Sequence, residues 1–236
     1  MILLAVSLGQ RLPWRNADAG NAPFWSYGYF VTDEGYYTSG GRLALLTGHC
    51  LDPEMNEPPT FGAAPGMHYL SAVSYRLRGL TYDACRLPTL LAGTAGWCAA
   101  YWLAASVTHP LVALAVTVPV SLNPLSLTYE RASSSDAVVG GFLLLALALL
   151  RSRRRPWYLL GGLCFAFAPA VKATGIAFAP LVVLTTLAMP RRRWARLGLG
   201  LLGYIIGWGA LHGLDFWILR RHPSEMVPAQ LRGACS

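Results

Sequence analysis

An adjacent pair of carboxylates, Asp33 and Glu34, lies in a polar segment ahead of a long series of hydrophobic segments. A carboxylate just outside a bilayer could accept a proton from a substrate hydroxyl held at the membrane surface. The same pair could instead cap a helix that begins near Gly35, because acidic side chains favour the positive end of the helix dipole. Residue type and spacing leave both interpretations open.

The second candidate is Lys172, the only lysine of the chain, which lies in the otherwise apolar interval 156–190. This interval is long enough for two helices of only about 15 residues each, so we expect a short hairpin in the membrane. Pro169 and Gly175 predict that its turn falls at Lys172. An ionisable group at membrane depth usually serves a function. The alternative is a lysine that extends its charge to the lipid headgroups.

The elements that must position these residues are membrane helices. The sequence is 54% hydrophobic and only 13% charged, whereas a soluble domain is typically about 25% charged. We therefore predict an all-α, polytopic transmembrane protein with six or seven short spans of about 20 residues. The five histidines are scattered without ligand spacing, and no glycine-rich phosphate loop occurs, so no cofactor is predicted, with a divalent metal left open.

The net charge of +8 arises from two arginine clusters in short loops. Outside these clusters the basic and acidic residues are equal in number. The positive-inside rule places both clusters in the cytoplasm and argues against a nucleic-acid surface. The clusters consist of Arg151, Arg153, Arg154 and Arg155, and of Arg191, Arg192, Arg193 and Arg196.

This orientation orders the rest of the chain. Residues 1–9 are expected to be the outer half of a first transmembrane helix whose beginning lies outside the sequence, because nine apolar residues are too few to span. Residues 10–85 are expected to form an extracytoplasmic loop with juxtamembrane helices, in which Cys50 and Cys85 could form a disulfide. Residues 86–214 form the predicted transmembrane helical domain, and 215–236 a short tail. The predicted spans outside the hairpin are Arg86–Val107, Leu111–Thr128, Ala137–Leu150 and Leu197–Leu214, with an outer loop at 129–136.

Several motifs occur in a characteristic order. TDEGYYTSGGRLALLTG and PGMHYLSAVSYRLRG precede the helix entry at Cys85-Arg86-Leu87-Pro88, and SLTYERASSSDAVVGGF and LLGGLCFAFAPAVKATGIAFAPLVVL follow it. Over residues 27 to 190, this order and spacing resemble the GT-C glycosyltransferases of the protein mannosyltransferase and aminoarabinose transferase kind.

The resemblance implies an inverting enzyme that moves a sugar from a polyprenyl-phosphate donor to a lipid or protein acceptor. It implies that Asp33 is the general base and that Glu34 is a weaker candidate or a residue that positions Asp33. Asp136 would lie near the mouth of the same cavity, or would be the N-terminal acid of the next helix. The residues available for the lipid phosphate are Arg86, Arg131 and Lys172.

Two other functions remain open at this stage. The chain could be a non-catalytic membrane protein that binds lipid-linked sugar or that scaffolds a complex. A transporter fits less well, because the sequence shows no internal repeat of broken helices. All three interpretations predict a multi-pass protein of the cell (inner) membrane that contacts no nucleic acid.

Overall fold

The computed structural model describes residues 2–12, 38, 40–43, 45–46, 65–131, 134–189 and 192–221. All regular secondary structure within these residues is helical. The predicted all-α fold is therefore confirmed.

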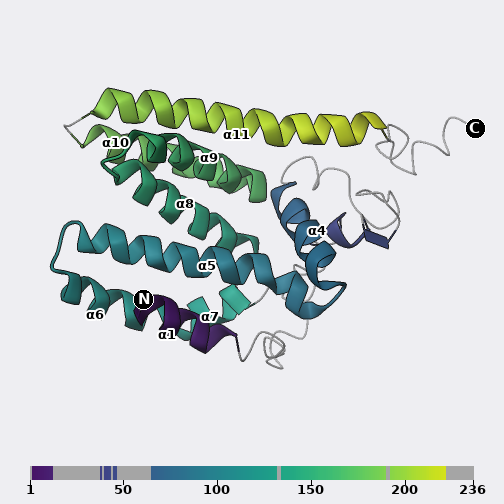
Figure 1. Cartoon of the computed structure of the whole chain (residues 1–236), viewed down its shortest axis with the longest axis horizontal. Coiled ribbons are helices and arrows are strands. Elements are labelled where there is room, and N and C mark those ends of the chain that lie inside the picture. The colour runs from purple at the N-terminus through teal and green to yellow at the C-terminus, as the bar shows by residue number, and fades with distance from the viewer. Residues whose placement is uncertain are drawn as a thin grey trace, which may run out of the picture.

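Five helices lie side by side and form the body of the structure (Figure 1). In spatial order across this row, the helices are α11 (Arg193–Arg221), α9 (Arg155–Val171), α8 (Ser135–Arg151), α5 (Tyr82–Ala105) and α6 (Pro110–Ser121). The N-terminal helix α1 (Ile2–Arg11) and the short α7 (Pro124–Arg131) pack near α5 and α6. Helix α4 (Gly66–Arg78), from the segment predicted to lie outside, lies across the helix ends on one side of this body.

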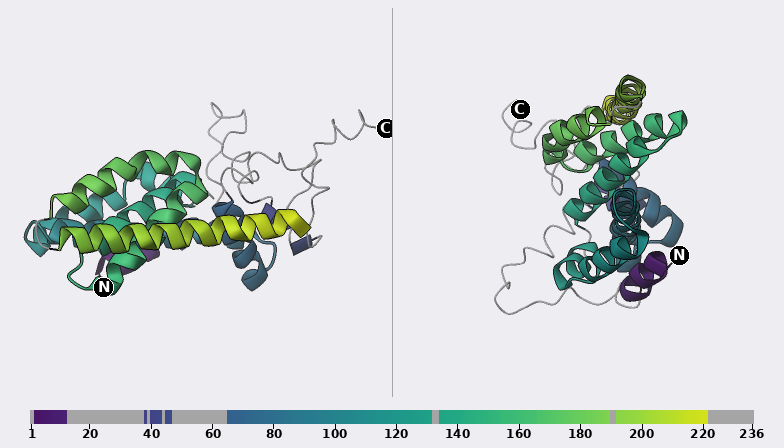
Figure 2. Two further views of the ribbon diagram at one scale, coloured as in Figure 1. Left: turned by 90° about the horizontal axis from the view of Figure 1, so that it is seen from above. Right: turned by 90° about the vertical axis from the view of Figure 1, so that its left-hand side faces the viewer.

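The two ends of the body, taken along the helix axes, carry different segments of the chain. The α8–α9 connection and the first turn of α11 lie at the end opposite α4 (Figures 1 and 2). A hydrogen bond joins the α8–α9 connection to the start of α11, because Arg192 Nη1 donates to the carbonyl oxygen of Arg153 at 3.2 Å. The described arginines of both clusters thus lie at one end of the helices, and α4 lies at the other.

The predicted hairpin is present, and its turn falls at Lys172. After α9 ends at Val171, the chain continues in the 3-10 helix η2 (Ala173–Phe178) and then in α10 (Ala179–Leu187). Gly175 allows this tight return, because a Cβ atom there would lie 2.6 Å from the backbone carbon of Ala168. The hairpin therefore requires glycine at this position.

The prediction of one continuous span over Leu111–Thr128 is wrong. The segment divides into α6 and α7 around Asn123 and Pro124. The Asn123 side-chain oxygen accepts a hydrogen bond from the backbone N–H of Leu125 at 2.9 Å and so begins a new helix. Because α7 extends to Arg131, the first part of the predicted loop 129–136 is helical as well.

Two further helix boundaries differ from the prediction. Helix α5 begins at Tyr82 instead of Arg86, because the Thr81 hydroxyl accepts from the backbone N–H of Ala84 at 3.1 Å and caps the helix earlier. Helix α11 extends beyond the predicted Leu197–Leu214 at both ends. Within the residues that the structure describes, α11 alone has a stretch long and apolar enough to cross a membrane, Arg193–Gly213. Shorter apolar helical stretches are Pro110–Ser121 and Ala173–Leu187.

Glycines allow α9 and α11 to approach closely. A Cβ atom at Gly162 would lie 1.9 Å from the carbonyl oxygen of Gly200, and one at Gly203 would lie 2.0 Å from that of Leu159. Such backbone contact is typical of packed membrane helices. Small residues let the helices come close enough for van der Waals packing, because the hydrophobic effect does not drive association within a bilayer.

Candidate functional site

An ion pair joins two of the predicted site residues. Lys172 Nζ lies 2.7 Å from Asp136 Oδ1, although the residues are 36 positions apart in the sequence. Asp136 is in the first turn of α8, and Lys172 is the C-cap of α9. The two side chains are 62% and 31% exposed, respectively. The Lys172 charge is therefore balanced by Asp136 but remains partly exposed. It lies at the same end of the helices as α4.

The neighbouring Ser135 adds an unsatisfied polar group at the start of α8. Its side-chain oxygen is buried and has no hydrogen-bond partner among the residues described. A buried hydroxyl of this kind is costly unless it finds a partner.

Helix α4 packs directly beside this ion pair. Its completely buried residue Met67 contacts a cluster that includes Val138 of α8 and Val171 of α9. Gly66 lies against the last turn of α9, since a Cβ atom there would be 2.9 Å from the carbonyl group of Ala170. The start of α4 is thus anchored at the last two residues of α9, immediately before Lys172.

The segment that follows the acidic pair is anchored to α4 in turn. The backbone N–H of Gly40 donates to His68 Nδ1 at 3.2 Å, and His68 is 3% exposed. Gly41 lies so close to α4 that a Cβ atom there would be 2.6 Å from the backbone nitrogen of Ala72. Burial lowers the pKa of His68 from 6.5 to about 4, so the ring is neutral and can accept this hydrogen bond.

A second contact ties the same segment to α5. The Cys85 thiol donates to the Thr38 hydroxyl at 3.6 Å, and Tyr75 of α4 packs in the same cluster as Cys85. Burial raises the pKa of Tyr75, with Cys85 contributing in the same direction. Cys50, the partner considered for a disulfide with Cys85, lies outside the described residues.

The other predicted site residues are placed unevenly. Asp33 and Glu34 lie outside the described residues, so the structure does not test their roles. Arg86 lies in the first turns of α5 and is buried, with 4% of its surface exposed. Arg131 is the last residue of α7, and its side chain lies outside the described part.

Sequence reasoning missed a buried carboxylate between α5 and α7. Glu130 is 6% exposed and accepts a hydrogen bond from Trp97 Nε1 at 2.5 Å. Gly93 gives it space, because a Cβ atom there would lie 2.8 Å from the Glu130 carboxyl carbon. The available signal was the helical spacing of Gly93 and Trp97 on one face of α5.

Among the residues described, no group of three or more histidine, cysteine, aspartate or glutamate side chains could hold a metal ion.

Comparisons with known proteins identify the fold. No protein-family model matches the sequence, and no curated protein matches it. Two crystal structures of ArnT from Cupriavidus metallidurans are similar to the chain. The apo structure has a TM-score of 0.64 and 21% identity, and the match covers 82% of this chain and 38% of that chain. The structure bound to undecaprenyl phosphate has a TM-score of 0.66 and 20% identity, and the match covers 94% and 41%.

The chain has a GT-C fold. ArnT is an aminoarabinose transferase with this fold, so the resemblance found in the motifs is confirmed at the level of the fold. The structural neighbour ArnT is a polytopic membrane enzyme. The chain spans about two fifths of the length of the ArnT chains that it matches.

Proposed function

We propose that this chain acts as a GT-C glycosyltransferase that moves a sugar from a polyprenyl-phosphate donor to a lipid or protein acceptor, with inversion at the anomeric carbon. The observation that carries the proposal is the ion pair between Lys172 and Asp136 beside the anchored helix α4. The similarity to ArnT bound to undecaprenyl phosphate, over 94% of this chain, supports a polyprenyl-phosphate ligand.

Lys172 is the proposed contact for the donor phosphate. Its side chain is 31% exposed, and its ammonium group lies 2.7 Å from the Asp136 carboxylate. A phosphate brings more negative charge and more acceptor oxygens than a carboxylate, so it can share or replace this contact. Arg86 and Arg131 are the further proposed phosphate ligands.

Asp33 is the proposed general base, and Glu34 is the proposed residue that positions it. The supporting observation is the anchoring of the chain at Gly40, six residues after Glu34. Gly40 bonds to His68 of α4, and α4 packs at the end of α9 beside Lys172. A carboxylate within reach of the acceptor hydroxyl would take its proton as the new glycosidic bond forms at the anomeric carbon. The bond to the phosphate oxygen breaks in the same step, and the phosphate leaves with its electron pair.

Asparagine at position 33 separates a base from a helix cap. It is nearly isosteric with aspartate and caps a helix about as well, yet it cannot accept a proton at neutral pH. Asp33→Asn is expected to lower transfer by about 10²- to 10⁴-fold with little change in thermal stability. Glu34→Gln, the matched control, is expected to have a smaller effect.

The assay follows loss of the polyprenyl-phosphate sugar in membranes that contain the chain, with a partner chain supplied if the chain alone is inert. An Asp33→Asn variant with undiminished transfer contradicts the assignment of the base. A wild-type chain that binds the donor but never transfers the sugar favours the second candidate, a non-catalytic protein that binds lipid-linked sugar. That candidate rests on the same ion pair, because binding requires the cation and not the base.

A further inference from the structure

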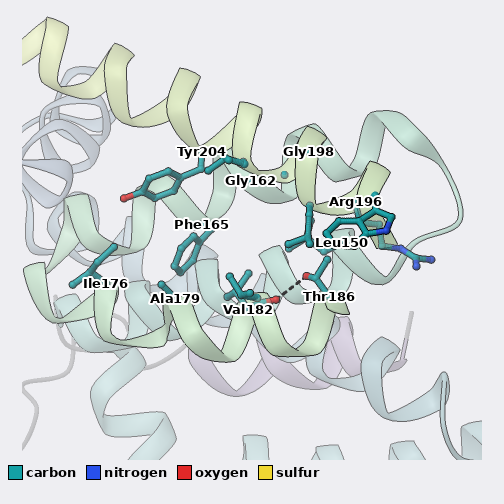
Figure 3. A pocket seen from close by; sticks show the side chains of 15 residues that line it. Leu150, Gly162, Phe165, Ile176, Ala179, Val182, Thr186, Arg196, Gly198 and Tyr204 are labelled. Carbon is teal, nitrogen blue, oxygen red and sulfur yellow. Dashed lines mark hydrogen bonds between the residues drawn. The ribbon is translucent and has the colours of Figure 1, made fainter. Parts of the chain in front are cut away.

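An apolar pocket of about 570 Å³ opens between α10 and α11, with walls that also include α8, α9 and η2. Its sides are formed mainly by carbon atoms, including those of Phe165, Val182 and Leu201. The Thr186 hydroxyl in the α10 wall donates to the carbonyl oxygen of Val182 at 2.7 Å, as the dashed line in Figure 3 shows. This polar group is therefore satisfied internally, and the pocket suits an apolar ligand.

One end of the pocket is cationic. Figure 3 shows Arg196 at one end of the pocket and Ile176 at the other. Arg196 is 7% exposed, and its guanidinium carbon lies 5.3 Å from the centroid of the Tyr158 ring. Contact with the ring holds the charge beside the pocket. Trp194, which also lines the pocket, is 70% exposed, as is usual for an aromatic residue at a membrane interface.

The cationic end continues into a larger basic surface. The hydrogen bond from Arg192 to the carbonyl oxygen of Arg153 brings the two arginine clusters together beside the pocket. Arg192 has a φ of 59°, a conformation that is uncommon for a residue other than glycine. No aspartate or glutamate occurs in the sequence between Asp136 and Asp215, so this part of the chain supplies no carboxylate to neutralise the surface.

The length of the pocket fits one leaflet of a bilayer. Along η2 and α10, from Ile176 to Thr186, the chain rises by about 15 Å. The hydrocarbon core of a bilayer is about 30 Å thick, so this length equals roughly half of it. A single acyl chain whose headgroup lies at the arginine surface would occupy such a depth.

We propose that this pocket binds an anionic phospholipid of the leaflet that faces the two arginine clusters. One acyl chain lies between α10 and α11, and the phosphate lies among the arginines, with Arg196 nearest the pocket. Guanidinium groups suit this role because they hold phosphate oxygens through paired hydrogen bonds. A role in membrane orientation alone requires only charge in the loops, and it explains neither the joined clusters nor the adjoining pocket. The proposal does not depend on sugar transfer.

A glycine in the pocket wall provides a steric test. A Cβ atom at Gly198 would meet nothing within 4 Å, so Gly198→Leu fills the pocket without a clash at that atom. Gly209 lies on the same helix, also has open space at its Cβ position, and does not line the pocket. Gly209→Leu is the matched control, because both substitutions change helix propensity equally.

Binding can be measured through the fluorescence of Trp194. Delipidated protein in a neutral detergent is titrated with phosphatidylglycerol that carries brominated acyl chains, and separately with phosphatidylcholine that carries the same chains. The part of the quenching that is lost in the Trp194→Phe variant comes from Trp194 and therefore reports on the pocket. The expected result is half-maximal quenching by phosphatidylglycerol at about a tenfold lower concentration than by phosphatidylcholine. Gly198→Leu should raise the phosphatidylglycerol concentration required about tenfold, and Gly209→Leu should leave it unchanged.

The headgroup assignment has its own test. Arg154 and Arg155 are exposed, so replacing both with glutamine leaves the packed helices intact. This double variant should lose most of the preference for phosphatidylglycerol. Equal quenching of the wild type by both lipids, or unchanged binding to Gly198→Leu, would overturn the proposal. Displacement of the brominated lipid by polyprenyl phosphate at equal concentration would also overturn it, because the pocket would then hold the tail of the carrier.

Discussion

Replacing Lys172 with methionine tests whether the ion pair with Asp136 marks the phosphate site. Methionine keeps the length and the apolar contacts of the side chain and removes its charge. The Lys172 and Asp136 side chains are 31% and 62% exposed, and ion pairs of such exposure contribute only about 0 to 1 kcal/mol to stability. The variant should therefore fold, with a thermal midpoint within a few degrees of the wild-type value.

Loss of the charge should have a larger effect on binding than on folding. A hydrogen bond between charged groups is worth about 1.5 to 3 kcal/mol, which corresponds to a roughly 10- to 100-fold weaker affinity for polyprenyl phosphate. Asp136→Asn is the matched control, because it removes the carboxylate that pairs with Lys172 and keeps the side-chain volume. This control should bind the lipid phosphate at least as tightly as the wild type, since the competing carboxylate is gone.

The assay is titration of the purified chain in detergent with a short-chain polyprenyl phosphate, read by isothermal calorimetry, with the parent polyprenol as the uncharged comparison. Unchanged affinity in a folded Lys172→Met variant would refute the reasoning. It would identify Lys172 as a lysine that extends its charge to the headgroups.

Three further predictions concern the framework of the site. His68 has a pKa lowered from 6.5 to about 4 by burial, so its contribution to stability is complete above pH 6.5 and is lost as the pH falls towards 4. Thermal unfolding should show a loss of about 3 kcal/mol over this range, and His68→Gln should remove that dependence. Gly203→Ala should destabilise the α9–α11 contact by about 1 to 3 kcal/mol in denaturant unfolding, and Gly209→Ala should not, because its Cβ atom meets nothing within 4 Å. In a cysteine-free background, an impermeant thiol reagent added outside the cell should label Leu80→Cys and not Ser152→Cys. The reverse pattern would show that the predicted orientation in the membrane is wrong.

Composition and local breakers predicted much of the fold. The hydrophobic fraction indicates membrane helices. The turn of the hairpin at Lys172 follows from Pro169 and Gly175, because these residues disfavour a continuous helix in the chain next to them. The division between α6 and α7 was missed because hydropathy continues across it, while Asn123 and Pro124 start a new helix. Helix boundaries are therefore predicted less well where an apolar stretch continues across them.

Tertiary contacts explain what the sequence could not predict at the site. His68 appears as one of five scattered histidines, and only folding brings it beneath the N–H of Gly40. Arg196 belongs to a cluster that the charge rule explains fully, yet it is buried over the ring of Tyr158. A charge pattern specifies the side of the membrane, but the packing of neighbouring helices decides which of its members is buried.

The ion pair between Lys172 and Asp136 also accounts for how a lysine can remain at the turn of a hairpin in the absence of a ligand. Asp136 supplies the compensating charge at 2.7 Å from the ammonium group. Because the pair is partly exposed, separating it costs only about 0 to 1 kcal/mol, less than the 1.5 to 3 kcal/mol expected from a charged phosphate contact. A lipid phosphate can therefore take the place of Asp136 with a net gain, whereas a fully buried pair would resist the exchange.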